Sequence, residues 1–394
     1  MEWERLVVGG GIVKRICILC ESWESGGIEA FLCNVISHMD RSELEIDIVV
    51  ARFGKSIFTK PLQELGIQFY QLSGSTRRIW QNYKLFQRLL SERRYDVMHL
   101  NACQGLALTY LRLAQEMGVP VRIAHSHNTA LRVSLTKPLK LVIHNWAKTR
   151  YTKEATDLWA CSKSAAEFLF SKRELDKRGY TFIPNGIDTE RFRFNSEMRE
   201  ITRAKLQLEG KFVIGNVGRL CFQKNQVFLL EVFREVLESE SESILLLVGD
   251  GKDKEKLKKK AAQLGIHDKV IFYGTTNQIE SLYWVMDVFV FPSRFEGLGI
   301  AVVEAQAAGL PVLCSEMIPQ EAIITNQIMQ LELSAGTKKW AEKLLKMDCS
   351  ERISGAAKVV KAGFDIQAVA GKIEAKWRGE AFEARENIRY RPCI

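Results

Sequence analysis

The amino-acid sequence predicts an α/β protein made of two doubly wound domains. With 394 residues, the chain is too long for one ordinary α/β core and suits two domains of similar size. From Arg15 onward, apolar strand-like runs alternate with amphipathic helical stretches, and this alternation is interrupted once, at residues 183–186, before it resumes. Continuous apolar strands separated by helices indicate a parallel sheet covered on both faces. Two such blocks predict two Rossmann-like domains facing across a cleft.

Short apolar runs mark the expected strands in each block. In the first block they are residues 16–20, 46–50, 96–100, 122–125 and 158–161. In the second block they are residues 212–217, 244–248, 270–273, 288–291 and 312–314. We therefore place the first domain at 1–185 and the second at 186–374. Two interpretations stay open for 375–394: a terminal helix that packs on the first domain, or a frayed tail.

The composition and charge limit the class of protein and its partners. The chain is 46% hydrophobic and 26% charged, as expected of a soluble globular protein, and no apolar run reaches the roughly 18 residues of a transmembrane helix. Its start contains Glu2 and Glu4 and no signal-peptide core, so we expect a cytoplasmic location. The net charge of +9 suggests an anionic partner. No nucleic-acid-binding motif occurs, which leaves an anionic membrane or a phosphorylated substrate.

Nine cysteines are scattered along the chain, and two of them form a CxxC pair, Cys17 and Cys20. The run ICILC has the pattern of a strand, which would point the two side chains to opposite faces. No further clustered ligands accompany them. We interpret them as buried, reduced thiols.

The strongest motif is EGLGIAVVE, which begins at Glu296 and ends at Glu304. It follows the expected strand 288–291, and its apolar residues lead into a helix. Gly297 and Gly299 leave backbone N–H groups exposed near the N-terminus of that helix, where anions bind. A carboxylate beside such a site can accept hydrogen bonds from sugar hydroxyls.

Two cations stand at the same expected sheet edge. Arg219 follows the first strand of the second domain, and Lys224 precedes the next helix. Five residues apart at a strand end, they could clamp a diphosphate. Taken alone the pattern is weak, but it becomes strong together with the two glutamates.

Two further motifs follow strands of the first domain. Ser25, Gly26 and Gly27 permit close backbone approach to a phosphate, although a plain turn is an equally good interpretation. His125 lies on a strand and is best interpreted as a core residue. His127 follows that strand and is well placed to bind a sugar hydroxyl or to transfer a proton.

Taken together, these motifs resemble glycosyltransferase family 4, especially its bacterial members that build capsular polysaccharides and exopolysaccharides. The resemblance covers about residues 15 to 330, and its motifs occur in the same order as in the family. These motifs are SGGIEAFLCNVISHMDRS, RIAHSHNT, FIPNGID, IGNVGRLCFQKN, LLLVGDG and FVFPSRFEGLGIAVVEAQAAGLPV. It implies the GT-B fold, with an N-terminal acceptor-binding domain and a C-terminal nucleotide-sugar-binding domain.

The resemblance also implies a role for each motif residue. Arg219 and Lys224 would hold the donor diphosphate, so that no metal or other cofactor is needed. Glu296 would contact the donor sugar, and Glu304 the ribose hydroxyls. The remaining implied contacts are the backbone amides of Leu298, Gly299 and Ile300 to sugar and phosphate, Gly27 over the phosphates, and His127 near the anomeric centre.

The implied activity is retaining transfer of a sugar from a nucleotide-diphosphate sugar to a glycan or lipid-linked acceptor, in surface polysaccharide synthesis. Uridine diphosphate is the commonest donor nucleotide in such families. Two alternatives stay open: a nucleotide-sugar epimerase of the same fold, and a non-catalytic nucleotide-sugar-binding protein.

Two basic segments of the first domain predict peripheral binding to an anionic membrane. Residues 77–94 have six basic residues against one acidic, and Ile79, Tyr83, Phe86 and Leu90 are expected on a buried helix face. The second segment, residues 131–153, has six basic residues and no acidic one. Its apolar residues include Leu139, Val142, Ile143 and Trp146. Such a mixture is typical of an interfacial helix.

Overall fold

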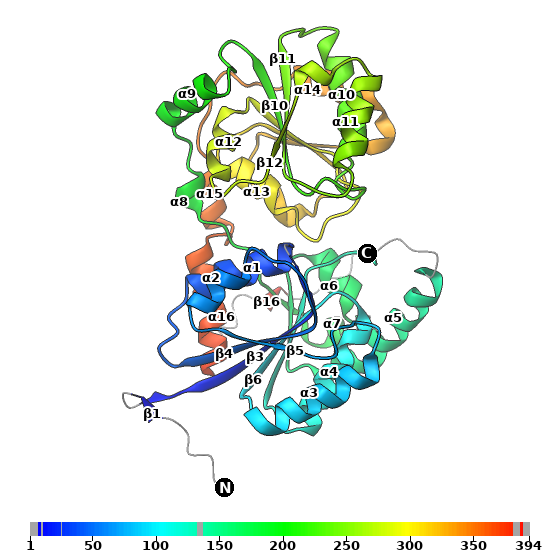
Figure 1. Cartoon of the computed structure of the whole chain (residues 1–394), viewed down its shortest axis with the longest axis vertical. Coiled ribbons are helices and arrows are strands. Elements are labelled where there is room, and N and C mark those ends of the chain that lie inside the picture. The colour runs from blue at the N-terminus through cyan, green and yellow to red at the C-terminus, as the bar shows by residue number, and fades with distance from the viewer. Residues whose placement is uncertain (1–6, 9–10, 25, 132–136, 381–386, 389–394) are drawn as a thin grey trace. The chain divides into compact units, whose positions relative to one another are not determined.

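The computed structural model describes residues 7–8, 11–24, 26–131, 137–380 and 387–388. The chain divides into two compact units, one of residues 1–186 with 366–394 and one of residues 187–365 (Figure 1). The first boundary lies one residue after the expected one. The second lies at Asp365, earlier than the expected residue 374, because the last described helix belongs to the first unit.

The main sheet of the first unit has eight strands among the described residues, in the order β16-β9-β8-β7-β6-β3-β4-β5. Its strands pair in parallel, except that β16 is antiparallel to β9. Their bounds are β3 Lys14–Trp23, β4 Leu44–Phe53, β5 Gln68–Gln71, β6 Val97–Ala102, β7 Val121–Ser126, β8 Asp157–Ala160, β9 Tyr180–Phe182 and β16 Asn387–Ile388. Two short antiparallel strands, β1 Val7–Val8 and β2 Gly11–Ile12, precede this sheet in the sequence.

Helices cover both faces of this sheet. In Figure 1, α1, α2 and α16 lie on one face, and α3, α4 and α5 lie on the other. The helix bounds are α1 Gly27–Ser37, α2 Thr59–Glu64, α3 Ile79–Arg93, α4 Thr109–Glu116, α5 Lys137–Tyr151, α6 Lys163–Leu169, α7 Lys172–Arg178 and α16 Ile366–Arg378, with the 3₁₀ turns η1 Gly105–Leu108 and η2 Thr152–Glu154.

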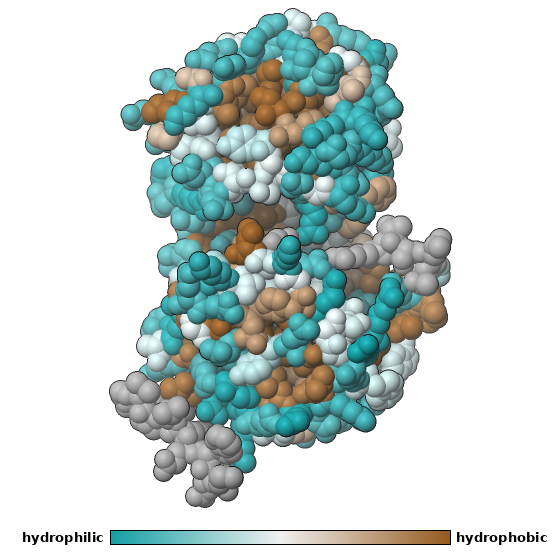
Figure 2. All heavy atoms as spheres, in the orientation of Figure 1, coloured by the Kyte–Doolittle hydropathy of each residue, from teal (hydrophilic) through white to brown (hydrophobic). Residues whose placement is uncertain are grey.

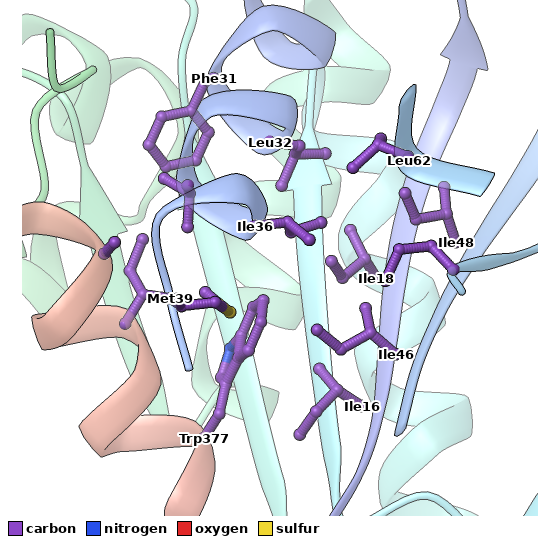
Figure 3. Packing of buried hydrophobic residues seen from close by; sticks show 14 of the residues in the cluster. Ile16, Ile18, Phe31, Leu32, Ile36, Met39, Ile46, Ile48, Leu62 and Trp377 are labelled. Atoms are coloured by element: carbon purple, nitrogen blue, oxygen red, sulfur yellow. The ribbon is translucent and has the colours of Figure 1, made fainter. Parts of the chain in front are cut away.

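The core of the first unit explains why α16 belongs to it. Trp377 is 1% exposed and packs with the isoleucines of β3 and β4 and with the apolar face of α1 (Figure 3). Next to it, the Arg378 guanidinium binds the carboxylates of Glu43 and Asp40, and Lys376 binds Asp157 at 2.7 Å. Burial of the large indole, with ion pairs around it, fixes the helix on this unit.

The second unit contains a sheet of parallel strands in the order β12-β11-β10-β13-β14-β15. Its first strand, β10, lies in the middle and pairs with β11 on one side and β13 on the other, which is the strand order of a Rossmann fold. The strand bounds are β10 Phe212–Val217, β11 Ser243–Val248, β12 Val270–Gly274, β13 Val288–Phe291, β14 Val312–Ser315 and β15 Ile328–Leu331.

Helices also cover both faces of the second sheet. One layer holds α10, α11 and α14, whose leucines, Phe233 and Trp340 form the main apolar cluster of this unit. The other holds α8, α9, α12, α13 and α15 (Figure 1). The bounds are α8 Thr189–Phe192, α9 Ser196–Lys205, α10 Gln226–Leu237, α11 Lys254–Gln263, α12 Ile279–Val285, α13 Ile300–Ala307, α14 Thr337–Leu345 and α15 Ala356–Lys361, with the 3₁₀ turns η3 His267–Lys269, η4 Gln320–Ala322 and η5 Leu333–Ala335.

The structure confirms the predicted fold, and every strand expected from the sequence is present. The strands that the sequence did not reveal are short or lie at sheet edges, such as β5 and β15, where polar residues interrupt the apolar pattern. Cys17 and Cys20 are buried free thiols of β3, as predicted, and burial raises the pKa of both. Within the described ranges, no helix is long and apolar enough to cross a membrane.

Candidate functional site

The candidate site of the second unit lies where its sheet changes direction. The chain runs outward from β10 to β11 and β12, then returns to place β13 on the other side of β10. In such a sheet the loops after the two central strands diverge, and ligands bind beyond the carboxyl ends of the strands at this point. Arg219 and Lys224 follow β10, and Glu296 follows β13.

Lys224 and Glu296 form a largely buried ion pair. The distance from Lys224 Nζ to Glu296 Oε1 is 2.7 Å, and the two side chains are 18% and 7% exposed. The same ammonium group lies over the ring of Phe291, 4.6 Å from its centroid. The carboxylate and the aromatic face hold the ammonium group at the sheet edge, where it can meet an anionic ligand.

Glycines allow the loop after β10 to pack closely on the loop after β11. A Cβ added at Gly249 would lie 2.2 Å from the carbonyl oxygen of Gly218, and one at Gly251 would lie 2.3 Å from that of Leu220. The backbone N–H of Gly218 donates to Val248 at 2.9 Å, which joins the two loops. The backbone of Arg219 is thereby fixed, while its side chain is exposed.

The loops after β10 and β13 are also bound to each other. The backbone N–H of Arg294 donates to the carbonyl oxygen of Gln223, and the Gln223 side chain donates to the carbonyl oxygen of Phe295. The Arg294 guanidinium donates to Asn225 Oδ1 at 2.9 Å and covers the ring of Phe222. These contacts set the relative positions of the Lys224 and Glu296 backbones.

The start of α13 presents backbone donors next to Glu296. Gly299 has φ of +86°, in the left-handed region that favours glycine, and Ile300 then begins the helix. The first N–H groups of a helix have no acceptor within it, and they point outward from its N-terminus. Leu298 is buried and anchors this turn.

Glu304 lies one turn further into α13 and has a buried partner. Tyr283 of α12 donates its hydroxyl hydrogen to Glu304 Oε2, at an oxygen–oxygen distance of 2.7 Å. Burial raises the pKa of Glu304, and the Tyr283 hydroxyl and the charges of Arg191 and Lys224 oppose this rise. The charge of Lys224 therefore acts on Glu304 as well as on its ion-pair partner Glu296.

Gly27 opens α1 of the first unit. A Cβ added there would meet no atom within 4 Å, so packing does not require a glycine at this position. The space above the first turn of α1 is therefore open, as close approach of a ligand would need. Ser25 lies outside the described residues.

His127 stands at the end of a group of buried histidines. Its Nε2 lies within hydrogen-bonding distance of Asn101 Oδ1, at 2.9 Å. Behind it, His125 and His99 share a hydrogen bond of 3.1 Å. Burial lowers the pKa of His127 to about 4, although the Asn185 side chain opposes this shift, and lowers that of His99 to about 3. At neutral pH His127 is an uncharged hydrogen-bonding group.

The structure brings several of the expected residues together within the second unit. Lys224, Glu296 and the start of α13 share one sheet edge, whereas Gly27 and His127 belong to the first unit. Sequence reasoning missed Tyr283 and Phe291. Tyr283 lies inside a helix and has the pattern of a core residue, whereas the motifs that stand out in the sequence lie in loops after strands.

Two family models match this chain, one to each unit. The model described as Glycosyltransferase Family 4 matches residues 25–191, and the model described as Glycosyl transferases group 1 matches residues 198–347. Among curated proteins, the putative glycosyltransferase EpsF of Bacillus subtilis is 28% identical over 344 residues, which are 86% of this chain and 89% of that protein.

Two further comparisons agree with this result. UDP-Gal:alpha-D-GlcNAc-diphosphoundecaprenol alpha-1,3-galactosyltransferase of Escherichia coli is 28% identical over 244 residues, which are 61% of this chain and 62% of that protein. The crystal structure of Anabaena Alr3699/HepE in complex with UDP superposes with a TM-score of 0.73 and 18% identity, and covers 93% of this chain and 100% of that one.

Fold, site and comparisons together define a glycosyltransferase of the GT-B type. The chain is similar to glycosyltransferase family 4 over residues 25–191, and to the putative glycosyltransferase EpsF over most of its length.

Proposed function

We propose that this enzyme transfers a hexosyl or related sugar, with retention of anomeric configuration, from a nucleotide-diphosphate sugar to a glycan or lipid-linked acceptor in the synthesis of a surface polysaccharide. The observation that carries the proposal is the Lys224–Glu296 pair at the switch point of the second sheet, 2.7 Å between Nζ and Oε1, beside the start of α13. An anion and a polyol are the ligands that such a combination of cation, carboxylate and helix N-terminus suits.

Each site residue has a separate task in this proposal. Arg219 and Lys224 bind the diphosphate and stabilise the negative charge that develops on it as the glycosidic bond breaks. Glu296 accepts hydrogen bonds from the sugar. The backbone amides of Leu298, Gly299 and Ile300 donate to sugar and phosphate.

Glu304 receives the ribose hydroxyls. For two residues of the first unit we propose ligand contacts of their own: the backbone at Gly27 approaches a phosphate, and neutral His127 hydrogen-bonds a sugar hydroxyl near the anomeric carbon. The acceptor oxygen attacks from the face that the diphosphate leaves, within an ion pair and without a covalent enzyme intermediate. Side-chain cations carry the charge stabilisation, so a metal ion is not required.

The donor nucleotide we propose is uridine diphosphate. The Escherichia coli relative is named for a UDP-galactose donor, and the Anabaena neighbour has UDP bound. The same relative is named for a diphosphoundecaprenol acceptor, which supports a lipid-linked acceptor here.

The outer surface of α5 supports action at an anionic membrane. His144 and Ala147 are the buried anchors of this helix: His144 Nδ1 accepts from the backbone N–H of Gly105, and His144 Nε2 donates to Phe168. The exposed apolar residues of α5 are Leu139, Leu141, Val142, Ile143 and Trp146. Figure 2 shows hydrophobic side chains gathered over this helix.

The charge around α5 favours a lipid surface as its partner. Residues 137–153 contain five basic residues and no acidic one. Each basic residue near an anionic bilayer contributes about 1 kcal/mol of binding, falling with salt. Insertion of the apolar side chains into the bilayer surface adds to this binding free energy, as it does for interfacial helices. Residues 132–136 of the expected segment lie outside the described ranges.

Vesicle sedimentation tests membrane binding. We expect the protein to sediment with phosphatidylglycerol vesicles at low salt and to be released at high salt. Substitution of Val142→Ser with Trp146→Ser should weaken binding severalfold. The matched control, Met198→Ser with Ile201→Ser on α9 of the second unit, removes two exposed apolar side chains elsewhere and should not. Wild-type protein that stays in the supernatant at low salt refutes the membrane proposal.

The stereochemistry of the product tests the transfer itself. Proton NMR during turnover of the donor, with an acceptor present, should show a new glycosidic bond with the anomeric configuration of the donor. Inverted product contradicts retention. Isomerised donor without acceptor consumption indicates an epimerase, and bound but unreacted donor indicates a binding protein.

A further inference from the structure

We propose that Tyr283 is a positioning residue for the nucleotide site, whose hydroxyl holds the Glu304 carboxylate in the orientation and ionised form that receives the ribose hydroxyls. This inference rests on the proposed role of Glu304. It assigns a function to a residue that lies inside α12, one element before β13, the strand that Glu296 follows.

The hydroxyl of Tyr283 has one proton and a preferred acceptor. Its oxygen lies 2.7 Å from Glu304 Oε2 and 3.3 Å from the carbonyl oxygen of Ala301. The shorter distance is that of a charge-assisted O–H···O⁻ hydrogen bond. Oε2 is thereby occupied, so in this proposal Oε1 accepts from the ribose hydroxyls.

The surroundings of Tyr283 keep this hydroxyl in place. Its side chain is fully buried, and its ring centroid lies 5.6 Å from those of both Phe192 and Phe289. The Arg352 guanidinium donates to its carbonyl oxygen at 2.6 Å, which fixes the end of α12. A hydrogen-bond donor on a side chain held this rigidly can fix the orientation of a carboxylate that would otherwise rotate.

The Tyr283 hydroxyl also affects the pKa of Glu304. Burial raises the pKa of Glu304, and the Tyr283 hydroxyl is the strongest opposing influence, followed by Arg191 of α8 and Lys224. Arg191 is itself paired with Glu280. Burial also raises the pKa of Tyr283, which therefore remains a donor at working pH.

Other charged residues occur on the elements packed against α13. Glu190 of α8 and Lys358 and Lys361 of α15 are exposed, and the η4 turn bears Glu321. Without the Tyr283 hydroxyl, Glu304 would take up its proton at a higher pH. A protonated carboxyl is a poorer acceptor for ribose hydroxyls, so nucleotide binding would be lost sooner on acidification.

The substitution Tyr283→Phe tests the proposal, because it keeps the ring and removes the hydroxyl. Calorimetric titration with UDP from about pH 5 to about pH 9 spans the range in which a raised glutamate pKa would act. We expect binding about tenfold weaker at neutral pH, with the acid loss of affinity starting at a higher pH than in wild type. For 2′,3′-dideoxyuridine diphosphate, which lacks the ribose hydroxyls, the variant and wild type should bind equally.

Two controls separate positioning from packing and from the proposed function. Phe289→Leu disturbs the packing around the Tyr283 ring but keeps its hydroxyl, and should lower the melting temperature without moving the pH profile. If it moves the profile as Tyr283→Phe does, or if Tyr283→Phe binds UDP with the wild-type affinity and profile, the positioning role is wrong. Wild type that binds none of the uridine, guanosine and adenosine diphosphates overturns the donor site itself.

Discussion

The substitution Lys224→Met removes the ammonium group from the carboxyl edge of the second sheet and keeps a side chain of similar length. Lys224 Nζ lies 2.7 Å from Glu296 Oε1, and the side chain of Glu296 is 7% exposed. Breaking a buried ion pair by removing one partner costs about 3–5 kcal/mol. Because the Lys224 side chain is still 18% exposed, we expect a smaller loss, about 2 kcal/mol, in the free energy of unfolding.

The effect on catalysis should exceed this structural effect. In the proposed mechanism Lys224 stabilises the departing diphosphate, and loss of one such contact costs about 3 kcal/mol of barrier, or roughly a hundredfold in turnover. The assay is the initial rate of nucleotide diphosphate release at saturating donor and acceptor. Urea unfolding of the same samples measures stability.

A double variant separates the two effects. Lys224→Met with Glu296→Gln leaves no unpaired charge, so stability should largely return. Turnover should stay low, because both ligand contacts are gone. Arg219→Ala removes an exposed cation and should lower turnover with little loss of stability. Near-wild-type turnover in Lys224→Met, or its return in the double variant, would refute the clamp.

Three further predictions follow from the site and the fold. Exhaustive chelation should leave turnover intact, because side chains supply the cations, and a loss that magnesium or manganese restores would contradict this. Glu296→Ala should mainly lower turnover and Glu304→Ala should mainly weaken UDP binding, so equal losses of UDP affinity by calorimetry would end the division of roles. Trp377→Ala should lower the free energy of unfolding by about 3–5 kcal/mol, measured in urea, since its indole is buried in the first core, and an unchanged midpoint would show that α16 is dispensable.

The strands and the site loops could be predicted because parallel strands are buried on both faces. Such strands are continuous apolar runs, and the loops after them are where polar motifs stand out. The start of α13 is an example: Gly299 and the apolar residues after it mark the turn and the helix, and both are present. The ion pair between Lys224 and Glu296 could not be predicted, because the expected fold places both residues at one sheet edge but does not fix the positions of their side chains.

The orientation of surface helices was only partly predictable. On α3 the expected buried face is present for Phe86 and Leu90, and Tyr83 is half-buried, but Ile79 is exposed. Ile79 has the helical spacing of the buried face. It is the first residue of α3, however, and the buried positions of the helix begin after it. Tyr283 shows the converse, because helical spacing alone cannot distinguish a packing aromatic from one whose hydroxyl serves a site.

Acceptor-dependent release of nucleotide diphosphate is the most direct test of the central claim. The enzyme is incubated with a uridine diphosphate sugar, with and without a lipid-linked diphosphate acceptor, and free UDP is quantified. We predict release that requires the acceptor, matches glycosylated product one to one, and falls about a hundredfold in Lys224→Met. Equal release with and without acceptor, or none with any of a panel of nucleotide sugars and acceptors, would contradict the account.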